Sequence, residues 1–391
     1  MAPMLTFCGR RCENGEPVRI TVDGERIAAV EPAWPASDVR EWPFVAPALF
    51  DLQINGRGGT WFGKAGITPS EILGVFAEQF RFGVTRICPT VITNSFDVLY
   101  GALSALRSAC EQERWAAQMA PGLHLEGPYI SGEDGPRGAH PREHVRPPDW
   151  KEFEKLQQAA GGRIRLVTLA PELPGATDFI RRAVASGVTV ALGHTAASGE
   201  EIAAAVEAGA RLSTHLGNGA HPTLRRHPNY IWEQLGDPRL SASVIADGHH
   251  IPPSVLRSII RTKGVRGVIL TCDASGLAGC APGVYSEAEM RMEVLDDGRI
   301  VVAGQRQLLA GSGADTGLCV SEAMQQAGVS LADACDMAGR NPSRLLGFEE
   351  IRLRPGSRAD LMLFRITELN SLEIQATIAA GSLRFGTTAS P

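Results

Sequence analysis

Two short stretches, Leu192-Gly193-His194-Thr195 and Thr214-His215-Leu216-Gly217-Asn218, decide the fold of this chain. Each follows an apolar run that predicts a buried strand, 188–192 before the first histidine and 211–214 before the second. Residues 198–210 lie between them and are rich in Ala and Glu, which predicts a helix. A strand, helix, strand unit makes its two strands parallel and adjacent, so both histidines are expected at the carboxyl ends of neighbouring strands.

The start of the intervening helix and the placement of the histidines agree with this interpretation. Ser198 followed by Glu201 has the spacing of a capping box, which marks a helix N-terminus. In a (β/α)₈ barrel the carboxyl ends of the strands form the catalytic face. Two imidazoles there, His194 and His215, can bind a metal such as zinc. The alternative is two unrelated structural histidines, but their matched placement favours a shared role.

Strand and helix signals alternate on both sides of this unit, as a barrel requires. Helical stretches include 70–82, 95–111 and 176–186. A run at 308–313 follows a hairpin signal at 296–298 and is interpreted as an insertion plus a loop that returns to the barrel mouth. The eight predicted strands are 47–52, 84–88, 122–125, 164–169, 188–192, 211–214, 241–246 and 268–272.

Both ends of the chain predict β structure without helices. Asn14-Gly15 and Asp23-Gly24 have the composition of tight hairpin turns, and 359–364 and 374–378 have the composition of strands. Neither end can bury a core alone, so together they are expected to form one small sheet domain beside the barrel. The length of 391 residues suits a barrel plus such a domain. The predicted domains are the discontinuous pair 1–44 and 346–391, and the catalytic barrel 45–345.

Composition excludes several classes of protein. The formal net charge is −5 with no acidic or basic block, which argues against a nucleic-acid partner. No apolar run approaches the ~18 residues of a membrane span, and residues 1–10 lack a signal-type pattern, so we expect a cytoplasmic protein with no membrane partner. The eight cysteines are scattered without a Cys-x-x-Cys pair. They predict buried thiols in a reducing compartment and not a disulfide frame or a thiolate zinc site.

Ionisable residues recur at the predicted strand ends, which points to a metal-dependent hydrolase. A catalytic zinc usually takes three protein ligands and leaves one position for water. Glu126, His194 and His215 supply a suitable ligand set, and Asp273 is then the base that takes the proton of the bound water. Two alternatives stay open: Asp273 as the N-cap of a helix after Ala274, and Glu126 as the ion-pair partner of a nearby arginine.

The sequence resembles the N-acetylglucosamine-6-phosphate deacetylase family of the amidohydrolase superfamily. The motifs that carry the resemblance occur in the family's order and span nearly the whole chain. The resemblance implies a distorted (β/α)₈ barrel, an α/β fold, with a small β-sandwich built from both termini. The motifs are 47–56 (PALFDLQING), 89–93 (PTVIT), 124–128 (HLEGP), 193–195 (GHT), His215 with Asn218, 245–250 (IADGHH), Asp273 with Ala274, and 341–345 (NPSRL).

The resemblance also implies roles for the site residues. It places a divalent metal at Glu126, His194 and His215, with Asp273 as the acid/base. Many superfamily members carry His-x-His after the first strand for a second metal, but this chain has Gln53 and Asn55 there. Amides are poor zinc ligands, so one metal per chain is predicted, with zinc as the first choice.

Substrate contacts are likewise implied. His140 is expected to hydrogen-bond the oxyanion, and Arg226 is the candidate for the phosphate because a guanidinium can bind two phosphate oxygens. Solvated or structural roles for Arg226, His140 and His250 are the alternatives. The loop 217–229 departs from the family pattern and is more basic than expected. The sequence therefore does not determine which acetamido sugar is the substrate, or whether that sugar is phosphorylated. The implied sugar-contacting positions are Ala139, His140, Asn218, Gly219, Arg226, His250, Leu309, Ala310 and Gly311.

The predicted function is therefore hydrolysis of the acetamide of N-acetylglucosamine 6-phosphate, or of a close N-acetyl amino sugar, to the amine and acetate. One alternative is an amidohydrolase for another N-acyl or cyclic amide. Another is a non-catalytic barrel that serves as a scaffold, which the presence of three ligands and a base disfavours. A homodimer is expected, because the family completes its pocket near a subunit interface and twofold dimers are the commonest assembly.

Overall fold

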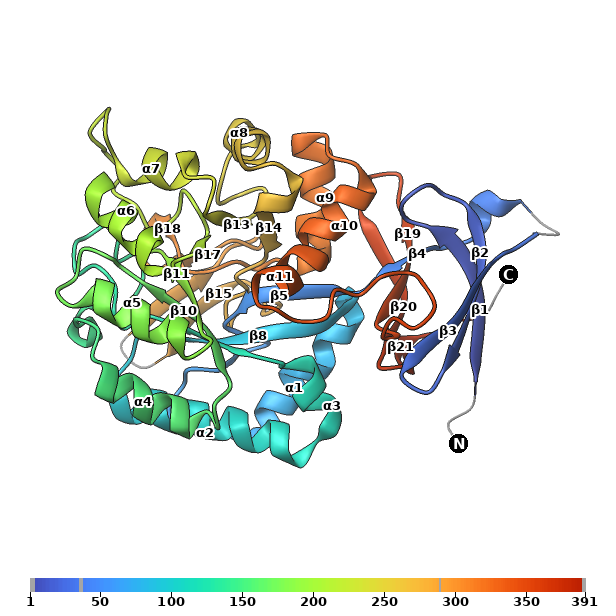
Figure 1. Cartoon of the computed structure of the whole chain (residues 1–391), viewed down its shortest axis with the longest axis horizontal. Coiled ribbons are helices and arrows are strands. Elements are labelled where there is room, and N and C mark those ends of the chain that lie inside the picture. Colours follow the sequence, from blue (N-terminus) through green and yellow to red (C-terminus); the bar gives the residue numbers. More distant parts are fainter. Residues whose placement is uncertain (1–3, 35–37, 288–289, 389–391) are drawn as a thin grey trace.

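A nearly closed barrel of eight parallel strands forms the body of the chain (Figure 1). The computed structural model describes residues 4–34, 38–287 and 290–388. Successive barrel strands pair in parallel, and all residues of the first and last strands are buried, as expected for strands covered on both faces. This confirms the predicted fold. The barrel strands are β5 (Leu49–Ile54), β8 (Val84–Ile92), β9 (Leu123–Glu126), β10 (Ile164–Leu169), β11 (Thr189–Leu192), β12 (Leu212–Ser213), β13 (Ser241–Ile245) and β14 (Val268–Thr271).

The barrel has a seam between β14 and β5, the two ends of the strand order. An isolated bridge joins Ile54 to Ala274 there, and the Asn55 N–H donates to the Ala274 carbonyl over 2.8 Å. The other strand neighbours share ladders of paired residues, so the seam has fewer backbone hydrogen bonds than the rest of the barrel.

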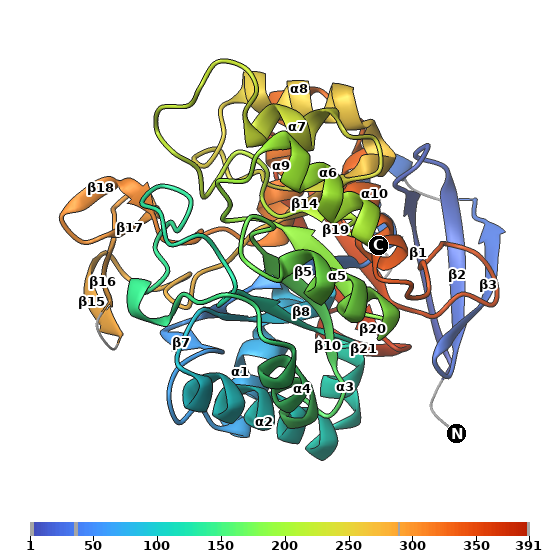
Figure 2. The same ribbon diagram turned by 60° about the vertical axis from the view of Figure 1, so that its left-hand side comes forward.

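Helices surround the sheet (Figures 1 and 2). The predicted capping box is present: Ser198 accepts from the Glu201 N–H, and the Glu201 carboxylate accepts from the Ser198 N–H. Among the described residues, no helix has the length and apolar character needed to cross a membrane. The helices are α1 (Pro69–Gln79), α2 (Phe96–Gln112), α3 (Arg114–Met119), α4 (Trp150–Ala159), α5 (Ala176–Ala185), α6 (Gly199–Ala208), α7 (Tyr230–Gly236), α8 (Pro253–Lys263), α9 (Thr316–Ala327), α10 (Leu331–Met337) and α11 (Arg340–Leu345).

Both ends of the chain meet in a seven-stranded sheet beside the barrel, as predicted (Figure 1). Its halves join where β19 pairs antiparallel with β4. Ile20, Leu361 and Ile378 belong to one buried cluster, so the two halves share a core in the manner of a sandwich. The strands are β1 (Leu5–Arg11), β2 (Pro17–Asp23), β3 (Arg26–Pro32), β4 (Phe44–Pro47), β19 (Leu361–Ile366), β20 (Leu372–Ala379) and β21 (Ser382–Gly386).

A four-stranded antiparallel sheet projects from the barrel after β14 (Figure 2). The predicted hairpin at 296–298 is present, with Val294 opposite Ile300. The insertion is larger than the single hairpin that the sequence indicated. Its apolar side chains, among them Met292 and Ile300, cluster with Trp61. The strands are β15 (Gly283–Glu287), β16 (Met290–Val294), β17 (Ile300–Val302) and β18 (Gln305–Leu309).

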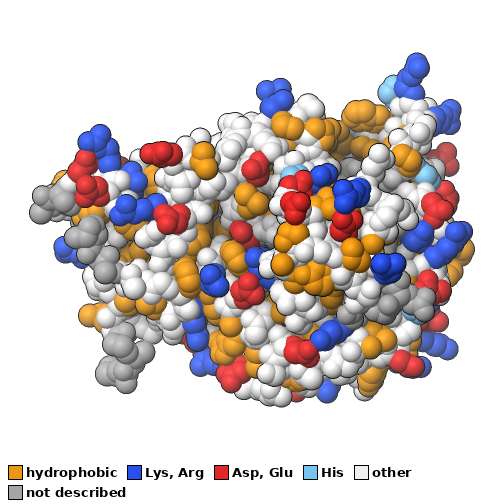
Figure 3. Space-filling view, turned by 180° about the vertical axis from the view of Figure 1, so that it is seen from behind, with side chains coloured by type: hydrophobic (Ala, Val, Ile, Leu, Met, Phe, Trp, Pro, Cys, Tyr) orange, Lys and Arg blue, Asp and Glu red, His pale blue; other side chains and the backbone are white. Residues whose placement is uncertain are grey.

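The surface carries charges of both signs. On the face shown in Figure 3, lysine and arginine side chains lie among aspartate and glutamate side chains, with apolar groups scattered between them. This mixture matches the small net charge of −5.

Candidate active site and metal centre

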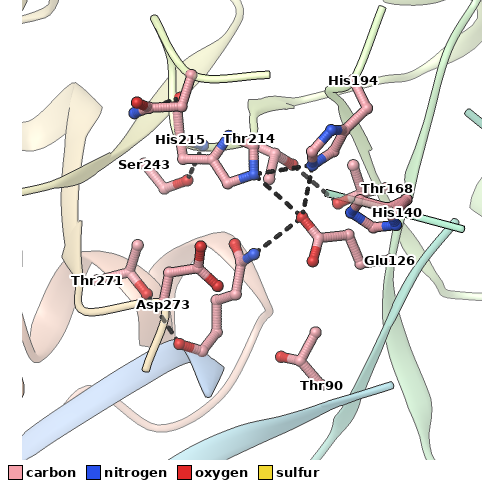
Figure 4. Close-up of polar contacts among 12 residues, drawn as sticks. Thr90, Glu126, His140, Thr168, His194, Thr214, His215, Ser243, Thr271 and Asp273 are labelled. Atoms are coloured by element: carbon pink, nitrogen blue, oxygen red, sulfur yellow. Dashed lines mark hydrogen bonds and ion pairs between the residues drawn. The ribbon is translucent and has the colours of Figure 1, made fainter. Parts of the chain in front are cut away.

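Three side chains converge at the carboxyl ends of β9, β11 and β12 (Figure 4). Oε1 of Glu126 lies 3.2 Å from Nε2 of His194 and 3.1 Å from Nε2 of His215. The two imidazole nitrogens are 3.1 Å apart. All three residues are buried. Glu126 is therefore partnered by the histidines, and the alternative of an ion pair with an arginine is wrong.

The backbone at the site adopts a conformation that is uncommon for residues other than glycine. His194, His215 and Asp273 have φ values of 51°, 28° and 49°. Such left-handed residues cost free energy and persist where the surrounding structure enforces them, often at functional sites. Each of these three residues follows a barrel strand, so the turn aims its side chain at the barrel mouth.

The donor set fits a divalent cation. Nδ1 of His194 donates to the Pro136 carbonyl over 2.9 Å, which orients the ring so that Nε2 faces Glu126 and, once it has lost its proton, can offer a lone pair to a metal. Burial alone would raise the pKa of Glu126, but hydrogen bonds from both histidines outweigh it and hold that pKa well below its usual range. Ligands at 2.0–2.1 Å in a tetrahedral zinc site stand about 3.3 Å apart. The observed separations of 3.1–3.2 Å are close to that value, so a cation could enter with little rearrangement.

Gln53 and Asn55 hold carboxylates. Nε2 of Gln53 donates to Oε1 of Glu126 over 2.9 Å, and Nδ2 of Asn55 donates to Oδ1 of Asp273 over 2.6 Å. Both amides are buried. Their N–H groups thus face the anionic groups of the site, which is an unfavourable arrangement for a second cation between them.

Asp273 follows β14 and faces the same mouth (Figure 4). A β-bridge at Ala274 and a turn follow it, so the alternative of a helix N-cap is wrong. Burial, with the negative charge of Glu126 as the next cause, raises the pKa of Asp273 to about 8. A carboxylate with a raised pKa binds protons more readily, which suits a general base.

His140 and Gly219 lie against the cluster. The ring of His140 is 4.3 Å from that of His194, and its Nδ1 is 2.8 Å from Oγ1 of Thr93. Glu126, His140 and His194 also offer ligand atoms within 4.8 Å of one another. Burial, followed by the charge of His194, lowers the pKa of His140 to about 3. A Cβ on Gly219 would lie 2.8 Å from Nδ1 of His194, so only glycine fits there without a shift.

The remaining sugar-contacting candidates are distributed around this centre. Ala139 packs against the apolar cluster of the inserted sheet, to which Ala310 belongs. The 309–311 loop reaches the centre, because the next amide, that of Ser312, donates to the Asp273 carbonyl over 2.9 Å. Asn218 donates to the His215 carbonyl over 3.3 Å.

The two candidates for the phosphate differ in their surroundings. His250 is paired with Asp247 at 2.7 Å, and its side chain is 6% exposed. Arg226 is exposed on its loop. The structure thus gathers the predicted metal ligands, base and His140 at one centre, while Arg226 stands on the surface.

Sequence reasoning missed several supporting residues. Thr93 and Pro136 contact His140 and His194, and Thr93 lies in a motif that the sequence had already singled out. Glu172 accepts from Oγ1 of Thr195 over 2.6 Å and from the Ala196 N–H over 2.7 Å. It therefore anchors the segment that follows His194, and no sequence signal marked it.

Comparison with known proteins identifies the family. The model of the amidohydrolase family matches residues 44–384. The chain belongs to the amidohydrolase family. N-acetylglucosamine-6-phosphate deacetylase of Homo sapiens is 34% identical over 350 residues, 87% of this chain and 83% of that protein. N-acetylgalactosamine-6-phosphate deacetylase of Escherichia coli O157:H7 is 31% identical over 342 residues, 86% of this chain and 87% of that protein.

A solved structure agrees with this membership of the amidohydrolase family. It is a variant of N-acetyl-D-glucosamine-6-phosphate deacetylase from Mycobacterium smegmatis in complex with N-acetyl-D-glucosamine-6-phosphate. The two chains are 31% identical, the TM-score is 0.84, and the match covers 95% of each. Amidohydrolases of this kind are enzymes, which removes the alternative of a non-catalytic scaffold.

Proposed function

We propose that this amidohydrolase hydrolyses the acetamide of an N-acetylhexosamine 6-phosphate, giving the free amine and acetate. Relatives named N-acetylglucosamine-6-phosphate deacetylase and N-acetylgalactosamine-6-phosphate deacetylase support this class of substrate. The observation that carries the proposal is the convergence of Glu126, His194 and His215 on one point at the barrel mouth, with the Asp273 carboxylate facing it. We take N-acetylglucosamine 6-phosphate as the first candidate.

The three converging residues would hold one divalent metal. One carboxylate and two imidazoles form a zinc-type ligand set, and the two amides described above favour a single ion. When bound, the metal would supply a Lewis acid that polarises the amide carbonyl and lowers the pKa of water.

Asp273 is the proposed acid/base. Its carboxylate takes the proton of the attacking water and then returns it to the departing nitrogen. The hydrogen bond from Asn55 fixes one of its oxygens and leaves the other free for the proton. Burial strengthens this base by raising its pKa.

His140 is the proposed donor to the developing oxyanion. The role requires the tautomer with its proton on Nε2, in which Oγ1 of Thr93 donates to Nδ1. The low pKa of His140 keeps the ring neutral, so it hydrogen-bonds the oxyanion without adding a positive charge beside the histidines.

The far end of the substrate is assigned to the loops. Arg226 and His250 would bind the phosphate, while Asn218, Gly219, Ala139 and the 309–311 loop would line the sugar. Such remote binding energy can align the reacting amide. We further propose a homodimer.

Acetate release from a small panel of substrates tests the proposal. The panel contains N-acetylglucosamine 6-phosphate, N-acetylgalactosamine 6-phosphate, the two unphosphorylated sugars and an N-acetyl amino acid. We expect a kcat/KM at least about 100-fold higher for one 6-phosphate than for its unphosphorylated sugar, equivalent to about 2.7 kcal/mol of transition-state binding. A preference for the N-acetyl amino acid would overturn the substrate class.

A further inference from the structure

Asp51 is a fully buried carboxylate at the barrel seam, outside the centre described above. Its Oδ1 accepts from the Gln53 N–H at 2.9 Å and from Oγ1 of Thr271 through a short contact. Its Oδ2 accepts from the Cys272 N–H at 2.9 Å and from Oγ1 of Thr316 at 2.7 Å. One carboxylate thus receives four hydrogen bonds from β5, from the end of β14 and from the start of α9.

These bonds do at the seam what a backbone ladder does elsewhere in the barrel. No ladder of paired residues joins β5 to β14, and an isolated bridge connects Ile54, at the end of β5, to Ala274, which follows β14. The Asp51 carboxylate adds two cross-strand hydrogen bonds, from Thr271 and Cys272. Burying a charged group costs free energy unless the group is fully hydrogen-bonded. An apolar side chain would fill the same space without this cost, so packing alone does not explain a carboxylate at this position.

The seam leads directly to the reactive groups. Asp51, Gln53 and Asn55 lie on one chain segment, along and just after β5, and Thr271 and Asp273 lie on the segment across the seam, at and just after the end of β14. The Asp51–Thr271 contact and the Asn55–Asp273 contact therefore form successive rungs between the same two chain segments. The middle residue, Gln53, donates to Glu126.

We propose that Asp51 is a positioning residue for the reaction. By fixing the register between β5 and the end of β14, it sets the position of the Asp273 carboxylate relative to the Glu126, His194 and His215 centre. The inference rests on the proposed role of Asp273 as acid/base.

A matched pair of variants tests the proposal, because two threonine hydroxyls donate to the same carboxylate. Thr271→Val removes the donor across the seam, and Thr316→Val removes the donor from α9. Because sub-ångström misplacement of a catalytic group is costly, we expect Thr271→Val to lower kcat about tenfold or more with KM within about twofold. We expect Thr316→Val to keep kcat within about twofold, and Thr271→Ser, which restores the hydroxyl, to recover most of the loss. Equal kcat for the two valine variants, or loss of the bound metal in Thr271→Val, would overturn the proposal.

Amide hydrogen exchange provides a readout that does not depend on the substrate. In Asp51→Asn the Cys272 amide loses a charged acceptor, so it should exchange at least about tenfold faster while metal content stays near one per chain. Unchanged protection of this amide would overturn the proposed register role. Absence of acetate release by the unaltered enzyme from every sugar phosphate would instead contradict the proposed function, and the exchange result would still be interpretable.

Discussion

Replacing Asp273 with asparagine should have opposite effects on activity and on the stability of the metal-free protein. The amide keeps the size of the carboxylate and one oxygen that can accept from Asn55, but it cannot take a proton from water. General acid–base groups contribute roughly 10²–10⁴-fold, so kcat should fall by that factor. The ligands Glu126, His194 and His215 are untouched, so the metal should stay bound.

The stability effect follows from the raised pKa. Burial shifts the pKa of Asp273 from 3.8 to about 8. The folded chain therefore binds this proton more tightly than the unfolded chain. Its stabilising contribution is complete below pH 3.8 and is lost as the pH rises toward 8. At pH 7 the loss amounts to at most about 4 kcal/mol, from 1.36 kcal/mol per pKa unit. The neutral amide of Asp273→Asn would avoid this loss, so the free energy of unfolding of the metal-free variant should rise by a few kcal/mol.

Two measurements check this reasoning. Acetate release gives kcat, and urea unfolding of chelator-treated and metal-loaded samples at pH 7 gives the free energies. The gain should be largest without metal, because a bound cation compensates the charge of Asp273. Near-normal kcat would mean that Asp273 is not the base. A metal-free variant less stable than the unaltered chain would mean that folding does not raise the pKa of Asp273 as described.

Three further outcomes are expected. Arg226→Ala should lower kcat/KM for the 6-phosphate about 10²-fold or more and barely affect the unphosphorylated sugar; equal losses would show that Arg226 does not bind phosphate. The kcat/KM of the metal-loaded enzyme should fall as the pH drops and Asp273 becomes protonated. The midpoint should lie below 8, because the positive charge of the metal lowers the pKa of Asp273. A pH profile of the unaltered enzyme without this fall at acidic pH would contradict the role of Asp273 as the base. Light scattering at micromolar concentration should give twice the chain mass, and a fully active monomer would contradict the homodimer.

The barrel strands were predictable because each is a short apolar run bounded by turn residues. The strand before His194, for example, was predicted at 188–192 and is found at Thr189–Leu192. The helix after it was predictable from its cap, since Ser198 and Glu201 are only three residues apart. Local patterns of this kind depend on neighbours in the sequence, so they can be recognised without knowledge of the fold.

The partners of the site could not be recognised in that way. Gln53 and Glu126 are 73 residues apart, and Asn55 and Asp273 are 218 apart. Only closure of the barrel brings them together. The sequence showed that the two amides are poor metal ligands, but not that their N–H groups hold the carboxylates. The inserted sheet was underestimated for a similar reason, because its strands are stabilised by contacts with distant residues such as Trp61.

Titration of the metal-free enzyme with zinc tests the central claim most directly. Activity on N-acetylglucosamine 6-phosphate, or on N-acetylgalactosamine 6-phosphate if the substrate panel favours it, is measured as zinc is added to chelator-treated protein. One ion bound by Glu126, His194 and His215 predicts no activity at the start, a linear rise and a plateau at one equivalent per chain. Full activity in the chelated protein, or a plateau that is reached only at two equivalents, would contradict the account.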